Sequence, residues 1–321
     1  MFREAKVVVI GGGTGLSVLL RGLKKFPLDI SAIVTVADDG GSTGKLRDIF
    51  EIPAPGDIRN VMVSLSKVEP LIESLMQYRF SQGILEGHAM GNLLLTALTD
   101  ITGNIVDGVQ ALSKVLNVEG NIIPLTDESV TLMAEFEDGT IIEGESKIDK
   151  ENKKIKRVFY KKAPKPIKEA IEVIEEADVV ILGIGSLYTS IMPNLLLPEI
   201  QDALIRTKAK KVYVCNAMEE PGETKGYTAS EHLKAINSHI GKNIIDAIIL
   251  NDENIPEDIQ KRYEATGVKE VIIDQEEIEK LEVAMFKHRI VEINSKGEVR
   301  HNSIRLASAI YSILLDWEYC C

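Results

Sequence analysis

The chain has 321 residues, of which 45% are hydrophobic, and its formal net charge is −12 at pH 7. This length allows a substantial core in one large domain or two small ones. An acidic chain repels polyanions, which argues against a general nucleic-acid-binding or membrane-binding surface. The three cysteines show neither a zinc-site spacing nor a disulfide framework, so we expect a reducing, cytoplasmic environment.

The start of the chain has the pattern of a βαβ unit. The run KVVVI at 6–10 is short, apolar and β-branched, which is typical of a buried parallel strand. Leucines then recur over 16–23 at the spacing of one helix face, and residues 30–37 form a second buried run. We expect no signal peptide, and the sequence has no uninterrupted apolar run of 18 residues that could span a membrane.

The next elements can be predicted in chain order up to residue 162. Helices are predicted at 57–66, 70–80, 91–101 and 105–117, and a strand at 121–125. The segment 126–162 differs, because apolar and polar residues alternate in places and Asp138-Gly139 is typical of a hairpin turn. We predict a small antiparallel β excursion here, either an insertion or a dimerisation arm, so a homo-oligomer is one expectation.

Helices and strands alternate again after this excursion. Helices are predicted at 167–177, 197–207, 228–240 and 256–266, and strands at 177–185, 210–217, 245–252 and 270–274. The run 289–293 precedes a last helix, whose apolar stripe indicates core packing and consists of Ile310, Ile313, Leu314 and Trp317. The pattern predicts one α/β domain over 1–321, with a Rossmann-like, doubly wound, mainly parallel sheet and the antiparallel β insertion 126–162.

A glycine-rich loop, IGGGTGLS at 10–17, joins the first strand to the first helix. Glycines let a backbone approach a pyrophosphate, and a helix N-terminus supplies amide donors. The nicotinamide fingerprint GxGxxG does not fit, because its third glycine would fall on Leu16 or Val18. The alternatives are a tight turn that binds nothing and a phosphate or nucleotide site. The candidate residues of that site are Gly11, Gly12, Gly13, Thr14 and Gly15.

Two aspartates, Asp38 and Asp39, end the second predicted strand. They lie about 20 residues past the glycine loop, where a carboxylate can accept from a ribose hydroxyl. They could also hold Mg²⁺ through water or act as a base. The simplest alternative is that Asp39 only caps the following turn.

The turn GGSTGK at 40–45 resembles a P-loop but fails its pattern. Gly40 and Gly44 enclose three residues instead of four, and Leu46 follows Lys45 where a serine or threonine is required. An ordinary ATPase is therefore not expected. Successive amides of such a turn can still form an anion nest, with Lys45 or Arg47 as counter-charge. The candidate residues here are Ser42, Thr43 and Lys45.

Several further polar clusters follow predicted strands or begin predicted helices. In PGDIRN, Asp57 is expected to be a helix N-cap, and GHAMGN places His88 at another helix start. Arg300 could reach a diphosphate or form a surface salt bridge. Because carboxyl ends of parallel strands share one edge, we expect a crevice there that suits a nucleotide diphosphate. The additional candidate residues are Asn92, Gly185, Ser186, Tyr188, Asn216 and Arg300.

Taken together and in this order, the motifs IGGGTGLS, VADDGGSTGKLR, PGDIRN, GHAMGN, GIGSLYTSIMPNLL and CNAMEEPGET resemble the gluconeogenesis factor family. This is the morphogenesis-linked branch of a group that includes a phospholactate transferase. The resemblance implies a Rossmann-like fold, a cytoplasmic role in cell shape and growth on gluconeogenic carbon, and binding of UDP-N-acetylglucosamine. The transferase relatives use Mg²⁺ near aspartates that correspond to Asp38 and Asp39.

Two functions stay open at this point. The first is a non-catalytic nucleotide-sugar sensor, and the second is a Mg²⁺-dependent transferase that acts on a nucleotide diphosphate-linked donor. A nicotinamide oxidoreductase is disfavoured by the glycine pattern.

Overall fold

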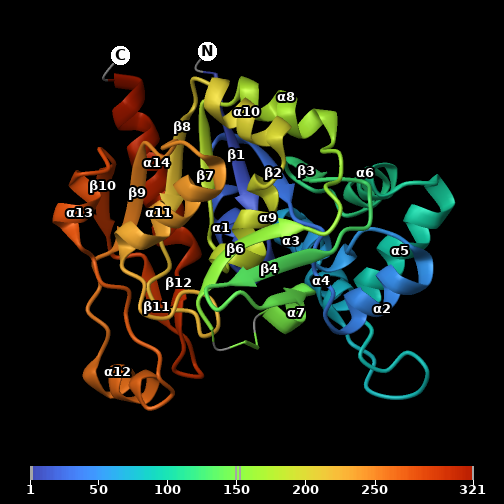
Figure 1. The fold of residues 1–321 in the computed structure, drawn as a ribbon. Coiled ribbons are helices and arrows are strands. Elements are labelled where there is room, and N and C mark those ends of the chain that lie inside the picture. The colour runs from blue at the N-terminus through green and yellow to red at the C-terminus, as the bar shows by residue number, and fades with distance from the viewer. Residues whose placement is uncertain (1–2, 149, 152, 320–321) are drawn as a thin grey trace.

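The computed structural model describes residues 3–148, 150–151 and 153–319, and its centre is a parallel sheet (Figure 1). Within these residues seven strands form the sheet in the order β10-β9-β8-β7-β1-β2-β3, and all neighbours are parallel. The order reverses between β1 and β7, as in a doubly wound fold. The strands are β1 Ala5–Gly11, β2 Leu28–Val34, β3 Asn121–Pro124, β7 Val179–Leu182, β8 Lys210–Val214, β9 Ala247–Asn251 and β10 Ala284–His288.

Helices flank this sheet, which explains why its central strands are continuous apolar runs. All four residues of β7 are buried, and so are Val7 to Gly11 of β1. The helices are α1 Gly13–Leu23, α2 Gly41–Phe50, α3 Pro55–Leu65, α4 Pro70–Gln77, α5 Met90–Thr102, α6 Ile105–Val115, α8 Lys168–Glu176, α9 Met192–Leu195, α10 Pro198–Arg206, α11 Ala229–Ile240, α12 Glu257–Glu264, α13 Gln275–Glu279 and α14 Ser303–Tyr319. The apolar stripe predicted on the last helix packs in the core, since Ile310, Ile313 and Leu314 are buried.

A three-stranded antiparallel sheet interrupts the α/β alternation, as the sequence predicts. It consists of β4 Leu132–Phe136, β5 Ile141–Glu143 and β6 Ile155–Tyr160, and the short helix α7 Glu145–Ile148 follows β5. Gly139 takes the left-handed conformation in the β4–β5 turn, with φ of 81°. The sheet is tied to the body by β6, where the Tyr160 hydroxyl donates to Pro193 O at 2.9 Å and Val158 N donates to His239 Nε2 at 3.1 Å.

The structure corrects the prediction at two places. The run 270–274 is not a sheet strand, because only Glu270 and Ile272 make isolated bridges; the seventh strand is β10, which the sequence analysis missed. Residues 41–50 are the helix α2, so Ser42 and Thr43 lie in a helical first turn instead of a glycine-rich loop. A π-helical turn, η1 Leu187–Ile191, follows β7, and a hairpin of β11 Val291–Ile293 and β12 Val299–His301 precedes α14.

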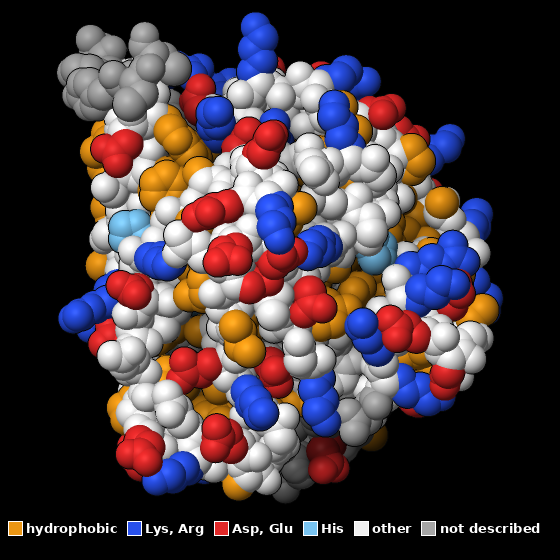
Figure 2. All heavy atoms as spheres, turned by 60° about the vertical axis from the view of Figure 1, so that its left-hand side comes forward, with side chains coloured by type: hydrophobic (Ala, Val, Ile, Leu, Met, Phe, Trp, Pro, Cys, Tyr) orange, Lys and Arg blue, Asp and Glu red, His pale blue; other side chains and the backbone are white. Residues whose placement is uncertain are grey.

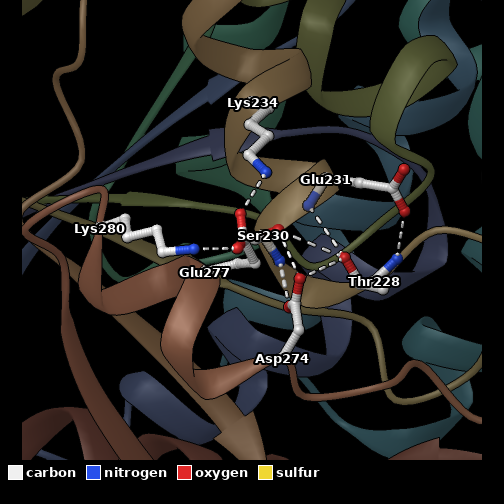
Figure 3. A network of polar contacts seen from close by, with 7 residues as sticks. All are labelled: Thr228, Ser230, Glu231, Lys234, Asp274, Glu277 and Lys280. Atoms are coloured by element: carbon white, nitrogen blue, oxygen red, sulfur yellow. Dashed lines mark hydrogen bonds and ion pairs between the residues drawn. The ribbon is translucent and has the colours of Figure 1, made fainter.

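The run 270–274 instead anchors the chain to the N-terminus of α11 (Figure 3). Thr228 and Glu231 form a capping box there, and Asp274 accepts hydrogen bonds from Ser230 N at 2.9 Å and from the Thr228 hydroxyl at 2.8 Å. An acidic side chain also complements the positive end of the helix dipole. These bonds fix the loop that enters α13.

No helix in the described part of the chain combines the length and the apolar character that crossing a membrane requires. On the face that Figure 2 shows, acidic side chains and the lysine and arginine side chains are interspersed. No single basic surface dominates this face.

Candidate functional site

A cleft of about 1150 Å³ opens at the carboxyl edge of the sheet, around the point where the strand order reverses. Its walls are the loops after β1, β7 and β8, together with α12 and the β11–β12 hairpin. Ligands of doubly wound folds bind at this position. The residues predicted from the sequence that line it are Gly13, Thr14, Gly15, Gly185, Ser186, Asn216 and Arg300.

The glycine loop is built for close contact with neighbouring backbone. Gly13 has φ of 66°, and a Cβ on Gly15 would lie 2.6 Å from Ile184 O, so the loops after β1 and β7 touch. A Cβ on Gly12 would meet the Thr35 and Asp57 side chains at 2.4 and 2.7 Å. The positive end of α1 begins at Gly13 and faces the cleft, where an anionic phosphate is favoured.

Gly11 and Gly12 lie behind this loop and do not line the cleft. Gly11 O accepts hydrogen bonds from Thr35 N at 3.0 Å and from Asn194 Nδ2 at 3.2 Å. Their contribution is therefore to the shape of the loop.

Two buried or half-buried glutamates hold the loop after β7. Glu223 is 4% exposed and accepts from Tyr188 N at 2.7 Å and from the Thr189 hydroxyl at 2.6 Å. The Ser186 hydroxyl donates to Glu220 at 3.3 Å. The sequence analysis missed both glutamates, although the run EEPGE follows β8 at the same sheet edge. They orient the hydroxyls of a π-helical turn, an element that is frequent at functional sites.

Tyr188 does not line the cleft. Its side chain is buried, and its hydroxyl forms a hydrogen bond of 2.8 Å with the Tyr227 hydroxyl. Burial is the main cause that raises the pKa of Tyr188 far above its ordinary value. The structure thus places this ring in the support of the loop.

Other predicted residues form a second polar cluster where α2 and α5 begin, and they do not line the cleft. Ser42 Oγ lies 3.1 Å from His88 Nδ1 and accepts from Asn92 Nδ2 at 3.3 Å. Asn92 also donates to the Thr43 hydroxyl at 3.4 Å. Lys45 is exposed on α2. Arg47 is turned toward the antiparallel sheet, because its Nη1 donates to Val130 O at 2.9 Å.

The two adjacent aspartates point to different partners. Asp38 Oδ1 accepts from Gly40 N at 2.8 Å, and its Oδ2 lies 2.9 Å from the position that a Cβ of Gly56 would take. Asp39 Oδ1 accepts from Ser146 N at 2.8 Å and so joins the start of α2 to α7. Asp38 therefore faces the polar cluster, while Asp39 holds the antiparallel insertion.

Asp57 connects the glycine loop to the polar cluster. The predicted N-cap role is wrong, because the N-cap of α3 is Ala54. Its carboxyl accepts a hydrogen bond from the Gly13 backbone, and it lies at the third position of α3. Burial raises the pKa of Asp57 to about 6; the charge of Asp38 adds to this effect, while the Gly13 bond and the charge of Arg59 oppose it. A carboxyl with such a pKa can exchange a proton near neutral pH.

The wall opposite the glycine loop carries basic and imidazole groups. Arg262, Lys296 and Arg300 line it, and Arg300 Nη2 donates to Glu298 at 3.2 Å. His301 lines the same wall, and burial lowers its pKa to about 4, so the ring is neutral at pH 7. His301 had no signal in the sequence beyond its place beside Arg300.

Known proteins share this architecture over nearly the whole chain. The family model described as 2-phospho-L-lactate transferase CofD matches residues 7–291. A gluconeogenesis factor of Bacillus subtilis (strain 168) is 50% identical over 320 residues, which cover 98% of this chain and 100% of the relative. A gluconeogenesis factor of Halalkalibacterium halodurans is 51% identical and covers 96% of each chain. A crystal structure from Bacillus halodurans, titled as a member of the UPF0052 family, has a TM-score of 0.93 at 50% identity, over 97% of this chain and 100% of that chain.

Proposed function

This chain belongs to the 2-phospho-L-lactate transferase CofD family, and we propose that it binds a nucleotide diphosphate-linked donor in the cleft and transfers a phosphoryl-linked group from it. The observation that carries this proposal is the position of Asp57. Its carboxyl lies directly behind the Gly13 amide, at the edge of the sheet where phosphates are bound, and its raised pKa suits proton transfer.

The cleft supplies the groups that a nucleotide diphosphate requires. The start of α1 offers amides to a phosphate, and the hydroxyls of Ser186 and Thr189 lie on the neighbouring loop. Arg262 and Arg300 on the opposite wall provide positive charge for a second phosphate or a sugar phosphate. The volume of about 1150 Å³ has room for a nucleoside as well.

Magnesium fits the space beside Gly56, behind the glycine loop, through one carboxylate. The described residues contain no group of three or more His, Cys, Asp or Glu side chains arranged for a metal. Mg²⁺ is commonly held by one or two carboxylates together with substrate phosphates. Asp38 would hold it, because Asp38 Oδ2 and the Thr43 hydroxyl flank the space beside Gly56. When bound, the ion neutralises charge on the phosphoryl oxygens.

The proposed transfer balances without a further reactant. The oxygen of an acceptor hydroxyl forms a bond to the distal phosphorus of the donor, and the bond from that phosphorus to the nucleoside phosphate breaks. A nucleoside monophosphate leaves, and the hydroxyl proton passes to the ionised Asp57 carboxylate. The glycine loop and Arg300 on the opposite wall hold the nucleoside monophosphate that leaves.

A second candidate is regulatory binding of a nucleotide sugar, UDP-N-acetylglucosamine, without turnover. It would serve cell morphogenesis and growth on gluconeogenic carbon sources. Two observations favour it: the relatives at 50% and 51% identity are named gluconeogenesis factors, and Asp39 is engaged with the backbone of α7. Such a protein would bind its ligand saturably and leave it unchanged.

Calorimetry combined with phosphorus NMR tests both functions. The purified chain is titrated with UDP-N-acetylglucosamine and with guanosine diphosphate esterified at its distal phosphate to lactate, each with and without Mg²⁺. An alcohol acceptor is then added, and the phosphorus spectra of the mixtures are followed over time. New phosphorus resonances that require Mg²⁺ and that disappear in Asp57→Asn support transfer. Saturable binding of UDP-N-acetylglucosamine with unchanged resonances supports the regulatory function. Absence of any nucleotide binding contradicts both.

A further inference from the structure

Arg59 is a buried arginine that forms no ion pair within the described residues, although the charges of Asp57 and Asp38 reach it. It lies on α3, is 6% exposed, and its Nη2 donates to Asn60 Oδ1 at 2.6 Å. Its Nε has no hydrogen-bond partner, and among the described residues no carboxylate forms an ion pair with its guanidinium. Arginine is almost never buried unless it is paired, because desolvating a charge is costly.

The surroundings of Arg59 are shaped to keep it in place. A Cβ on Gly91 would lie 2.8 Å from the Cγ and Cδ atoms of Arg59, so α5 begins with a glycine where the arginine passes. Burial is the main cause that lowers the pKa of Arg59, and the charge of Arg79 lowers it further, while the charges of Asp57 and Asp38 oppose this shift. Arginine is not deprotonated in proteins, so Arg59 remains cationic despite this shift.

Arg79 brings a second guanidinium near enough to Arg59 for its charge to act on it. It lies in a hairpin-like segment between α4 and α5, where it forms a bridge with Ala89, and its Nη1 donates to Gly87 O at 3.0 Å. In the part of the chain that the structure describes, neither arginine has a salt bridge within 4.0 Å. Two like charges held together in this way favour an anion between them.

Three helices begin beside the two arginines. Ser42 of α2 accepts from the backbone of Ala89 just before α5 at 3.4 Å, and Thr43 lies against Gly56 of α3. The N-termini of α2, α3 and α5 therefore meet, and their positive ends add to the charge of the arginines. Asn92 is 1% exposed, yet its Oδ1 has no partner. Unsatisfied buried groups of this kind point to a ligand or a bound water.

We propose that Arg59 and Arg79 form a second oxyanion site, which binds a phosphate or carboxylate group of a molecule other than the nucleotide. None of the residues named for this site lines the cleft. Asp57 links the two sites, because it accepts a hydrogen bond from Gly13 and its charge acts on Arg59. That the ligand at Gly13 is a nucleotide rests on the proposed function. The site would place an anionic group of the acceptor, or of an effector, in the neighbourhood of Asp57 and outside the cleft.

The experiment is a calorimetric titration of the whole chain with inorganic phosphate, and separately with L-lactate, in the absence and presence of saturating UDP. We expect one of these anions to bind in both conditions. We expect Arg79→Ala and Arg59→Lys to weaken that binding about tenfold to a hundredfold, since each removes charge-assisted hydrogen bonds. Arg21→Ala is the matched control on the exposed surface of α1 and should leave binding unchanged. The anion that binds distinguishes a phosphate from a carboxylate ligand.

Each other result overturns the inference. Anion binding that UDP abolishes would assign the anion to the glycine loop, and binding that survives both arginine variants would assign it elsewhere. Failure of both anions to bind would also contradict the site. Arg79 is exposed, so its variant is expected to fold even if an Arg59 variant does not. If UDP fails to bind while the anion still binds through Arg79, the proposed nucleotide function fails and the oxyanion site stands.

Discussion

Asp57 accepts a hydrogen bond from the backbone N–H of Gly13, which joins the start of α3 to the loop where the proposed phosphate would bind. The bond uses an amide of the glycine loop and places a carboxyl behind it. An ionised Asp57 therefore repels a phosphate at the loop unless a proton or a cation intervenes. In the proposed function, this contact would couple the protonation of Asp57 to ligand binding at the glycine loop.

The raised pKa of Asp57 predicts a pH dependence of stability. Below about pH 4 the carboxyl is protonated in both states, whereas between about pH 4 and 6 the unfolded chain loses the proton first, so stability falls as pH rises. Above pH 6 the ionised Asp57 carboxylate lowers the free energy of unfolding by its full amount, about 2 to 3 kcal/mol. Asp57→Asn should therefore be more stable than the unchanged chain at pH 8 and equally stable at pH 4, measured by urea unfolding. A constant difference at all pH values would contradict the assigned pKa.

Two glycines of the same loop should respond differently to alanine. A Cβ on Gly15 would lie 2.6 Å from Ile184 O, whereas the nearest atoms to a Cβ on Gly11 belong to Leu16 at 3.8 to 4.0 Å. We expect Gly15→Ala to lower the free energy of unfolding by about 1 to 3 kcal/mol, because packed backbone cannot move aside freely. Gly11→Ala should not lower it, because the added Cβ makes ordinary van der Waals contact and glycine inside a strand is about 0.5 to 1 kcal/mol less favourable than alanine. Equal losses in chemical denaturation would show that the contact between the β1 and β7 loops is not the cause.

The role of Glu223 can be tested with its amide. A glutamine keeps the size of the side chain but offers only one acceptor oxygen, so either Tyr188 N or the Thr189 hydroxyl loses its bond. We expect Glu223→Gln to weaken nucleotide binding by about tenfold, which corresponds to one lost hydrogen bond of about 1.4 kcal/mol. Glu175→Gln, on the exposed surface of α8, serves as the control. Unchanged affinity in Glu223→Gln, measured by calorimetry, would assign this glutamate to stability alone.

The sequence predicted those parts of the fold in which local pattern and burial agree. β1, β7 and β9 are apolar runs because both of their faces are covered, so their type was evident. The strand β10, AMFKH, escaped prediction because none of its residues is fully buried and it contains lysine and histidine. The start of α2 escaped because GGSTG has the composition of a turn; contacts from His88 and Asn92 on Ser42 support the helix instead.

In the candidate site too, local sequence pattern predicted the position of the loops but not the side-chain partners that are distant in sequence. The loops after β1, β7 and β8 could be placed at one edge, because the strand pattern implied a parallel sheet. The partners of the acidic residues could not be predicted, since Asp39 and Ser146 are 107 positions apart and Thr189 and Glu223 are 34 apart. The residue type alone does not tell whether a carboxylate in a motif faces a ligand or caps a helix.

The pair Asp38 and Asp39 offers the sharpest test of the metal proposal, because the two adjacent carboxylates have different surroundings. Asp38 Oδ2 faces the space beside Gly56, so Asp38→Asn should abolish any Mg²⁺-dependent increase in nucleotide affinity with little change in stability. Asp39 accepts from Ser146 N, so Asp39→Ala, which removes this acceptor, should lower the free energy of unfolding by about 1 to 2 kcal/mol and retain the Mg²⁺ effect. Calorimetric titrations with and without Mg²⁺, together with urea unfolding, measure both quantities. If Asp39→Ala alone removes the Mg²⁺ dependence, the ion is held on the side of α7, and the assignment to Asp38 is wrong.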